Sequence, residues 1–226
     1  MLMTRILKRL LGKDEASLGG RDSLLHRRVL CIGGVNEFAT MPYHYSGWIK
    51  DLLSERPLEG ARFVKSVLQL KELEAATYDA VYYSHQLKDH SLHEGQLILQ
   101  GIRHMLKPGG FLHLRVPDVL VLVHQLVQEG HDLEDVAYLS AAGPICYHDV
   151  LWGRGIEVAD AGLKMRGHRA GFSRKLLERL LSDSGFNAVQ RVESPDALEI
   201  EVIAAVDRLQ DDYRIILGLK AVEVKT

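Results

Sequence analysis

Short apolar segments alternate along the chain with longer segments in which apolar residues recur at helical spacing. Strand candidates are residues 28–34, a run that ends in two glycines, then 47–53, 61–67, 78–85, 111–116, 187–191 and 198–206, of which 47–53 fits a helix equally well. Helix candidates are residues 91–106, 119–128 and a segment that follows Ser173. Parallel strands need crossover connections, so this alternation predicts an α/β fold with a doubly wound, mostly parallel, seven-stranded sheet.

The segment from Leu106 to Asp118 gives the clearest local pattern. Pro108 cannot continue the preceding helix, and Gly109 and Gly110 provide the positive-φ freedom that a reversal needs. The apolar run that follows is typical of a buried strand, and Pro117 lacks a backbone donor where that strand should end. The segment therefore predicts a helix end, a tight turn and a strand in direct succession.

The length of 226 residues favours one main domain. We expect an N-terminal basic helix and linker over residues 1–25 and the main domain over 26–206. Within that domain, residues 131–167 contain scattered glycines and aromatic residues, and we expect them to form an irregular insertion or lid. Residues 207–226 are expected to form a C-terminal tail or helix.

Composition excludes several classes of protein. Lys and Arg number 28 against 30 Asp and Glu, so no overall positive field would recruit nucleic acid. No apolar run reaches the roughly 20 residues of a membrane span. Residues 1–13 alternate apolar and basic positions, which fits an ordinary N-terminal helix better than a weak contact with a membrane surface. With only two cysteines, a disulfide scaffold is not expected and the cytoplasm is the expected compartment.

Ligands of doubly wound sheets bind beyond the carboxyl ends of the strands. The residues to examine are therefore the turn from Gly33 to Val35, then Asp51, Ser66 and the Ser84–His85 pair, each at the end of a candidate strand.

Several of these segments, in this order, resemble one known family. They are Leu30-Cys31-Ile32-Gly33-Gly34, Gly47-Trp48-Ile49, Pro57-Leu58-Glu59-Gly60, Tyr78-Asp79-Ala80-Val81-Tyr82-Tyr83-Ser84-His85, Leu106-Lys107-Pro108-Gly109-Gly110, Val116-Pro117-Asp118, Gly171-Phe172 and Ser184-Gly185-Phe186. Together they resemble class I S-adenosylmethionine-dependent methyltransferases, in particular a bacterial type 11-like subgroup, over residues 28 to 205. The resemblance implies a Rossmann-like fold, S-adenosylmethionine as the cofactor, and methyl transfer to a small-molecule or saccharide-type acceptor. It does not indicate an oligomeric state.

The resemblance also implies roles for individual residues in cofactor binding. Gly33 and Gly34 would let the backbone approach the methionine and ribose portions, because a Cβ there would collide with them. Asp51 would accept hydrogen bonds from the ribose hydroxyls. Ser66 would meet the adenine edge, and Val35, Val67 and Ser84 are further candidates for contact with the cofactor.

This chain departs from the family at two cofactor positions. Val35 stands where the family usually has Gly, and Ser66 stands where it usually has Asp. The cofactor motif is therefore degenerate. This keeps open the alternative of a catalytically silent, methyltransferase-like binding or scaffold protein.

Two histidines are the candidates for catalysis. His85 would be a general base at the end of the fourth strand, although a histidine that merely closes the turn fits equally well. His168 precedes the last long helix and is the second candidate. His85, His90, His93 and Asp89 also cluster, but no second ligand set follows, so a metal site is not expected. A nicotinamide-dependent oxidoreductase is disfavoured because no Gly-x-Gly-x-x-Gly follows the first strand.

Overall fold

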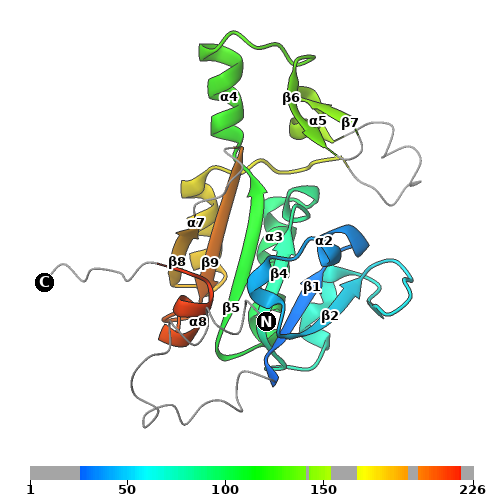
Figure 1. Ribbon diagram of the computed structural model, residues 1–226, viewed down its shortest axis with the longest axis vertical. Helices are drawn as coiled ribbons and strands as arrows, with labels where there is room; N and C mark the ends of the chain where they lie inside the picture. Colours follow the sequence, from blue (N-terminus) through cyan, green and yellow to red (C-terminus); the bar gives the residue numbers. More distant parts are fainter. Residues whose placement is uncertain (1–25, 141–142, 154–166, 193–197, 220–226) are drawn as a thin grey trace, which may run out of the picture.

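A seven-stranded sheet forms the centre of the computed structural model, which describes residues 26–140, 143–153, 167–192 and 198–219 (Figure 1). The strand order is β3-β2-β1-β4-β5-β9-β8. The strands are β1 (Arg28–Ile32), β2 (Ile49–Ser54), β3 (Arg62–Phe63), β4 (Tyr78–Ser84), β5 (Leu106–Pro117), β8 (Ala188–Val192) and β9 (Glu199–Ala205). β9 pairs antiparallel with both β5 and β8, and the other four pairings of the sheet are parallel. The predicted α/β fold with a doubly wound, mostly parallel sheet is therefore confirmed.

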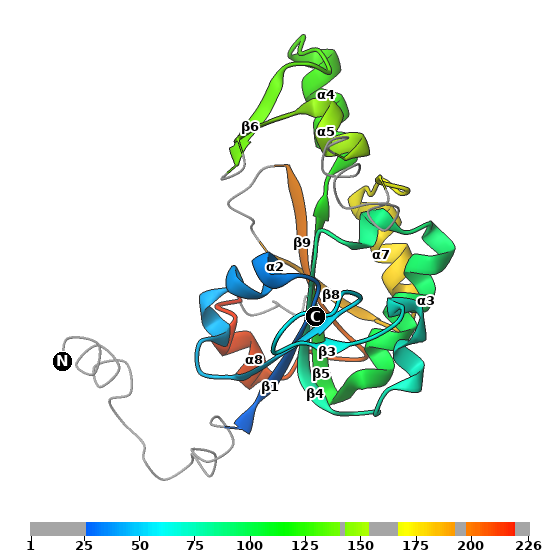
Figure 2. The same ribbon diagram turned by 90° about the vertical axis from the view of Figure 1, so that its right-hand side faces the viewer.

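Helical segments cover both faces of the sheet (Figure 2). One face packs against η3 (Val67–Glu72), α3 (Leu92–Met105) and α7 (Arg174–Asp183). The other face packs against α2 (Val35–Ala39), η2 (Tyr43–Tyr45) and α8 (Asp211–Ile216). A further short turn, η4 (Leu87–Asp89), follows β4. Successive strand residues point to opposite faces, so each strand contributes to both cores.

The cap of α3 explains where that helix begins. The Ser91 hydroxyl accepts a hydrogen bond from the Glu94 amide, and the Glu94 carboxylate accepts one from the Ser91 amide. The Glu94 carboxylate accepts hydrogen bonds from both the Ser91 amide and, at 2.9 Å, the Ser91 hydroxyl; these two bonds, with help from Arg169, lower the pKa of Glu94 to about 2. On the inner side of the helix Ile98, Leu99 and Ile102 are fully buried. The predicted helix over 91–106 is thus confirmed to within a residue at each end.

The Lys-Pro-Gly-Gly segment differs from the expected tight turn. β5 already begins at Leu106, which pairs with Tyr78, and the next registered pair joins Ala80 to Phe111. The intervening residues of β5 form a bulge inside one long strand, with Gly109 at a φ of 78°. The glycines are needed for that bulge, which the sequence pattern does not distinguish from a turn.

A small subdomain lies beyond the carboxyl end of β5 (Figure 1). It consists of α4 (Val119–Gln128), a hairpin of β6 (Val136–Ser140) and β7 (Gly143–Cys146), and α5 (Tyr147–Trp152). These elements share a core that includes Leu122, Ile145, Tyr147 and Val150. The expectation that residues 131–167 are irregular is wrong for this hairpin and helix, whose strands are too short to stand out as periodic segments. Residues 154–166 lie outside the described part.

Two other expectations concern the ends of the chain. The basic helix and the membrane-surface contact expected at residues 1–13 fall outside the described residues. The C-terminal segment contains α8, whose Tyr213 is buried against the sheet. Among the described residues, no helix combines the length and the apolar character needed to cross a bilayer. Cys31 and Cys146 are both free thiols.

Candidate functional site

The order of the strands determines where a ligand would bind. From β1 the chain proceeds through β2 to β3 in one direction, and from β4 to β5 in the other. The direction therefore reverses between β1 and β4, which are neighbours. Ligands of doubly wound sheets bind at such a point, beyond the carboxyl ends of the strands. The turn after β1 and the turn after β4 therefore flank the candidate site.

The turn after β1 is lined by the chain's own side chains. The Gly33 amide donates to the Leu53 carbonyl at 2.9 Å, and the Gly34 amide donates to Glu37 Oε2 at 2.9 Å. A Cβ on Gly33 would lie 2.7 Å from Gln86 Nε2, and one on Gly34 would lie 2.9 Å from Glu37 Oε2. Both contacts involve the ends of flexible side chains, so a ligand would have to displace Gln86 and Glu37 to reach the glycines.

Val35 is the first residue of α2 and is 57% exposed. Its side chain therefore lies at the surface of the turn rather than within the core. The structure places it beside Gly34, as the sequence predicts.

The loops after β2 and β3 are tied together at the same edge. Glu55, the first residue after β2, accepts a hydrogen bond from the Val67 amide at 2.8 Å through Oε1. Ser66 caps η3 by accepting a hydrogen bond from the Leu68 amide at 3.2 Å. Ser66 and Val67 therefore lie at the carboxyl edge as predicted, and Glu55 lies there as well.

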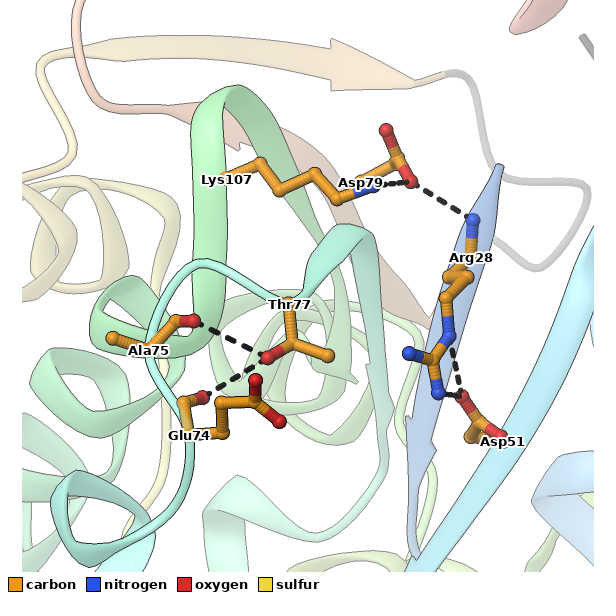
Figure 3. A network of polar contacts seen from close by, with 7 residues as sticks. All are labelled: Arg28, Asp51, Glu74, Ala75, Thr77, Asp79 and Lys107. Atoms are coloured by element: carbon orange, nitrogen blue, oxygen red, sulfur yellow. Dashed lines mark hydrogen bonds and ion pairs between the residues drawn. The ribbon is translucent and has the colours of Figure 1, made fainter. Parts of the chain in front are cut away.

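Asp51 does not lie at the end of β2, the position that the sequence pattern predicts for it. It is the third residue of that strand and is paired in register with Leu30. Figure 3 shows Asp51 beside Arg28, on the neighbouring strand β1. Its carboxylate binds the Arg28 guanidinium at 2.7 Å. The expected position is wrong because β2 extends to Ser54, which leaves Asp51 about 10 Å short of the strand end. The first acidic residue beyond the end is Glu55.

His85 follows the buried Ser84 at the end of β4 and adopts an uncommon backbone conformation. Its φ is 58°, and among the described residues Ala76 is the one other non-glycine residue with a positive φ. The His85 amide donates to the Arg115 carbonyl at 3.0 Å. Its ring Nε2 lies 3.0 Å from Glu199 Oε1, and the side chain is 38% exposed. Strained backbone of this kind concentrates at functional sites.

Glu199 belongs to a chain of polar contacts that joins β9 to the neighbouring strand β5 and to η2. Arg115 NH2 donates to Glu199 Oε2, and Arg115 Nε lies 3.6 Å from Glu201 Oε2. The other oxygen of Glu201, Oε1, lies 2.7 Å from His113 Nε2, and His113 Nδ1 lies 3.1 Å from the Tyr45 hydroxyl. We call Tyr45, His113, Glu201, Arg115 and Glu199 the inner network.

The electrostatics of this network fix its protonation. Burial lowers the pKa of His113, although the hydrogen bond to Glu201 opposes this. Burial by itself would raise the pKa of Glu199, but His85 and Arg115 outweigh it and the pKa is lowered. For Glu201, burial likewise raises the pKa, but His113 and Arg115 outweigh it and the pKa is lowered. At neutral pH both carboxylates are therefore ionised. A neutral His113 then donates from Nε2 to Glu201 and accepts the Tyr45 hydroxyl at Nδ1.

His168 occupies a different position. Its Nδ1 lies 2.9 Å from the Val150 carbonyl, and its Nε2 lies 3.9 Å from Asp89 Oδ1. Burial, followed by the charge of Lys88, lowers the pKa of His168. The ring joins η4 to α5, and no contact among the described residues brings it to His85. Its catalytic role stays a prediction.

Sequence reasoning missed Arg115, His113, Glu199 and Glu201. A signal was present, because each pair is spaced two residues apart in a strand whose intervening residues are apolar. Polar residues at alternate positions of a central strand indicate that one face of that strand is polar. What the pattern lacks is the pairing of β5 with β9, which brings together residues 84 positions apart.

Many solved structures resemble this chain, and two of them illustrate the likeness. One is the CurJ carbon methyltransferase, with a TM-score of 0.50 and 13% identity over 90% of this chain. The chain spans 52% of the CurJ chain, about half its length. The other is a putative zinc-dependent alcohol dehydrogenase from Rhodobacter sphaeroides, with a TM-score of 0.52 and 16% identity over 82% of this chain and 86% of that one. No protein-family model and no curated protein sequence matches the chain. At these identities the likeness shows the fold alone.

Proposed function

We propose that this protein is an S-adenosylmethionine-dependent methyltransferase that acts on a hydroxyl group of a small-molecule or saccharide-type acceptor. The observation that carries the proposal is the His85–Glu199 pair, with Nε2 and Oε1 3.0 Å apart, at the turn after β4. That turn adjoins the glycine turn after β1, where Gln86 meets Gly33. An acid–base pair thus lies beside the place where a doubly wound sheet binds its ligand. The CurJ enzyme, which shares the fold, is a carbon methyltransferase.

The residues at this edge fit the cofactor. Gly34 has no Cβ, so a ligand can approach its backbone closely. Its amide donates to the Glu37 side chain, which can move away. The exposed Glu55 carboxylate at the end of β2 takes the ribose role first expected of Asp51. Val67, at the start of η3, adjoins Glu55 and would contact the adenine. When bound, the cofactor supplies a methyl group already activated on a sulfonium sulfur, so catalysis depends mainly on positioning.

His85 supplies the base that a hydroxyl acceptor needs. In its neutral form the ring donates Nε2–H to Glu199, which leaves Nδ1 to accept the proton that the hydroxyl loses. The lowered pKa of Glu199, for which burial is outweighed by His85 and Arg115, keeps that carboxylate charged as the ring becomes cationic. Glu199 therefore both orients the ring and stabilises its protonated form.

A second candidate is a catalytically silent binding protein of the same fold. The observation that favours it is that Gln86 and Glu37 lie against the two glycines of the turn. In a silent protein these side chains would remain there permanently. Val35 would then cause no clash, because no cofactor would enter the turn.

Calorimetric titration with S-adenosylhomocysteine separates the two. For the methyltransferase we expect saturable binding and a rise in melting temperature, because a ligand that binds only the folded form must stabilise it. No heat and no thermal shift at millimolar ligand would reject the methyltransferase and favour the silent protein.

The ribose role of Glu55 makes a separate prediction. Glu55→Gln removes the charge that would accept hydrogen bonds from the ribose, so we expect binding of S-adenosylhomocysteine to weaken about 10-fold, or about 1.4 kcal/mol. Asp51→Asn is the matched control, because Asp51 lies inside β2 and binds Arg28. We expect its affinity to equal that of the wild type. If Asp51→Asn weakened binding and Glu55→Gln did not, the two assignments would have to be exchanged.

A further inference from the structure

The inner network results from the register between two strands. Arg115 of β5 lies opposite Glu201 of β9, and Pro117 lies opposite Glu199. Glu199 and Glu201 are two positions apart and share one face of β9, while Ile200 and Val202 are buried on the other. Two carboxylates are therefore fixed side by side on the face that leads to His85.

Arg115 determines which oxygen of Glu199 is left for His85. Its NH2 group takes Oε2, so the carboxylate presents Oε1 to the ring at 3.0 Å. Its Nε lies toward Glu201, so one guanidinium separates two like charges that would otherwise repel each other. Arg115 thus orients Glu199 and, together with His85, outweighs burial and lowers the pKa of that carboxyl.

Buried side chains fix the position of Glu201. It binds His113, which is 1% exposed and in turn accepts the hydroxyl of the fully buried Tyr45. Replacing a buried ionic cluster by well-packed apolar residues is often neutral or stabilising, so a cluster of this kind is weak evidence for a role in stability. Its position next to the proposed base favours a role in function.

We infer that Arg115 and Glu201 are positioning residues that orient Glu199 toward His85 and set the charge around the His85 ring. This inference rests on the proposed function. The charged groups on β5 and β9 that face the pair are Arg115, Glu199 and Glu201, whereas on η4 Lys88 and Asp89 bind each other at 3.0 Å. With His113 neutral, the inner network carries two negative charges and one positive.

This charge count predicts that removing a negative or a positive charge of the network shifts the protonation midpoint of His85 in opposite directions. Glu201→Gln keeps the side-chain shape and removes a negative charge, so His85 should take up its proton at a pH about 0.5 unit lower than in the wild type. Arg115→Met removes a positive charge and should shift the midpoint by about 0.5 unit upward. Arg115→Lys keeps the charge and should leave the midpoint near that of the wild type. Arg191→Met is the control: Arg191 lies on β8 and forms an exposed ion pair with Glu178 of α7, so its loss should not shift the midpoint.

The measurement is an NMR titration of the labelled His85 ring in the folded full-length protein, with no cofactor present. A merely structural role would not shift the midpoint in opposite directions. Unchanged midpoints, or shifts of the same sign, in Glu201→Gln and Arg115→Met would overturn the inference. If Arg115→Met does not fold, the isosteric Glu201→Gln decides alone.

A methyl-transfer assay gives the second readout. With the acceptor saturating, Arg115→Lys should lower kcat about 10-fold with little change in the KM for the cofactor, because the guanidinium geometry is lost while its charge remains. A kcat equal to that of the wild type would overturn the orienting role. Opposite NMR shifts in a protein that binds no S-adenosylhomocysteine would instead keep the network and reject the proposed function.

Discussion

Replacing His85 with asparagine is expected to lower the rate of methyl transfer to a hydroxyl acceptor by about 10²- to 10⁴-fold. Asparagine tolerates a positive φ better than most residues, so it should preserve the backbone at the 58° φ of His85. It has no group that can accept a proton from the acceptor hydroxyl at neutral pH. Binding of S-adenosylhomocysteine should change little, because the proposed cofactor contacts lie on the turns after β1, β2 and β3.

The matched control is His93→Asn. His93 is an exposed residue at the start of α3, eight positions along the chain, so its replacement tests for nonspecific effects of losing a histidine nearby. We expect its kcat to equal that of the wild type. A wild-type rate for His85→Asn, in a protein that still binds the cofactor product, would exclude His85 as the base. The acceptor would then be a nucleophile that needs no deprotonation.

The pH dependence of the wild-type rate provides a second check on the same residue. A histidine base accepts a proton only while its ring is neutral, so kcat should fall as the pH drops into the acidic range. Burial would raise the pKa of Glu199, but His85 and Arg115 outweigh it and lower that pKa. The carboxylate therefore stays ionised in this range. A rate that does not depend on pH between about 5 and 8, the interval in which histidine normally titrates, would contradict general-base catalysis.

Local pattern predicted most of the fold because each element is fixed by its own residues. Ser91 and Ser173 cap α3 and α7 through hydrogen bonds within three residues of chain. The apolar runs of β1 and β4 are buried on both faces, which distinguishes them from the surrounding amphipathic segments. Gly33, Gly34, Ser66, Val67, Ser84 and His85 therefore lie at the predicted edge of the sheet.

What local pattern did not predict depends on register. Asp51 and Glu55 are both acidic and four residues apart, and the point at which β2 ends decides which of them lies at the carboxyl edge of the sheet. Arg115 and Glu199 are brought together by the antiparallel pairing of β5 with β9 across 84 residues. The periodicity of either strand alone contains no information on which residue of the other it faces.

Gly110→Ala is expected to destabilise the protein by about 3 kcal/mol, the largest effect we expect from adding one methyl group. A Cβ there would lie 2.9 Å from the Asp79 carbonyl, 3.0 Å from the Lys107 carbonyl and 3.2 Å from the Tyr78 carbonyl. All three contacts involve backbone oxygens of β4 and of the β5 bulge, which cannot rotate away as a side chain can. Relief would require β4 and β5 to separate at the centre of the sheet.

Two other glycines of the chain make the experiment quantitative. A Cβ on Gly47 would meet nothing within 4 Å, so Gly47→Ala should change stability by less than about 0.5 kcal/mol. Gly109→Ala should cost about 1 kcal/mol, because its φ of 78° disfavours alanine while the nearby Gln210 side chain can move. Urea unfolding followed by circular dichroism should rank the midpoints Gly47→Ala, Gly109→Ala and Gly110→Ala from highest to lowest, the last about 1 M below the wild type.

The ranking matters because the three changes are chemically identical. Alanine ordinarily gains about 0.5 to 1 kcal/mol over glycine inside a strand, since it loses less conformational freedom on folding. A loss at Gly110 must therefore come from the carbonyl oxygens that surround it, and it would show that the second glycine of Lys-Pro-Gly-Gly is required for close approach of β4 and β5 rather than for chain reversal. Equal midpoints for Gly110→Ala and Gly47→Ala would mean that the bulge opens at little cost, and that the position of Ser84 and His85 does not depend on it.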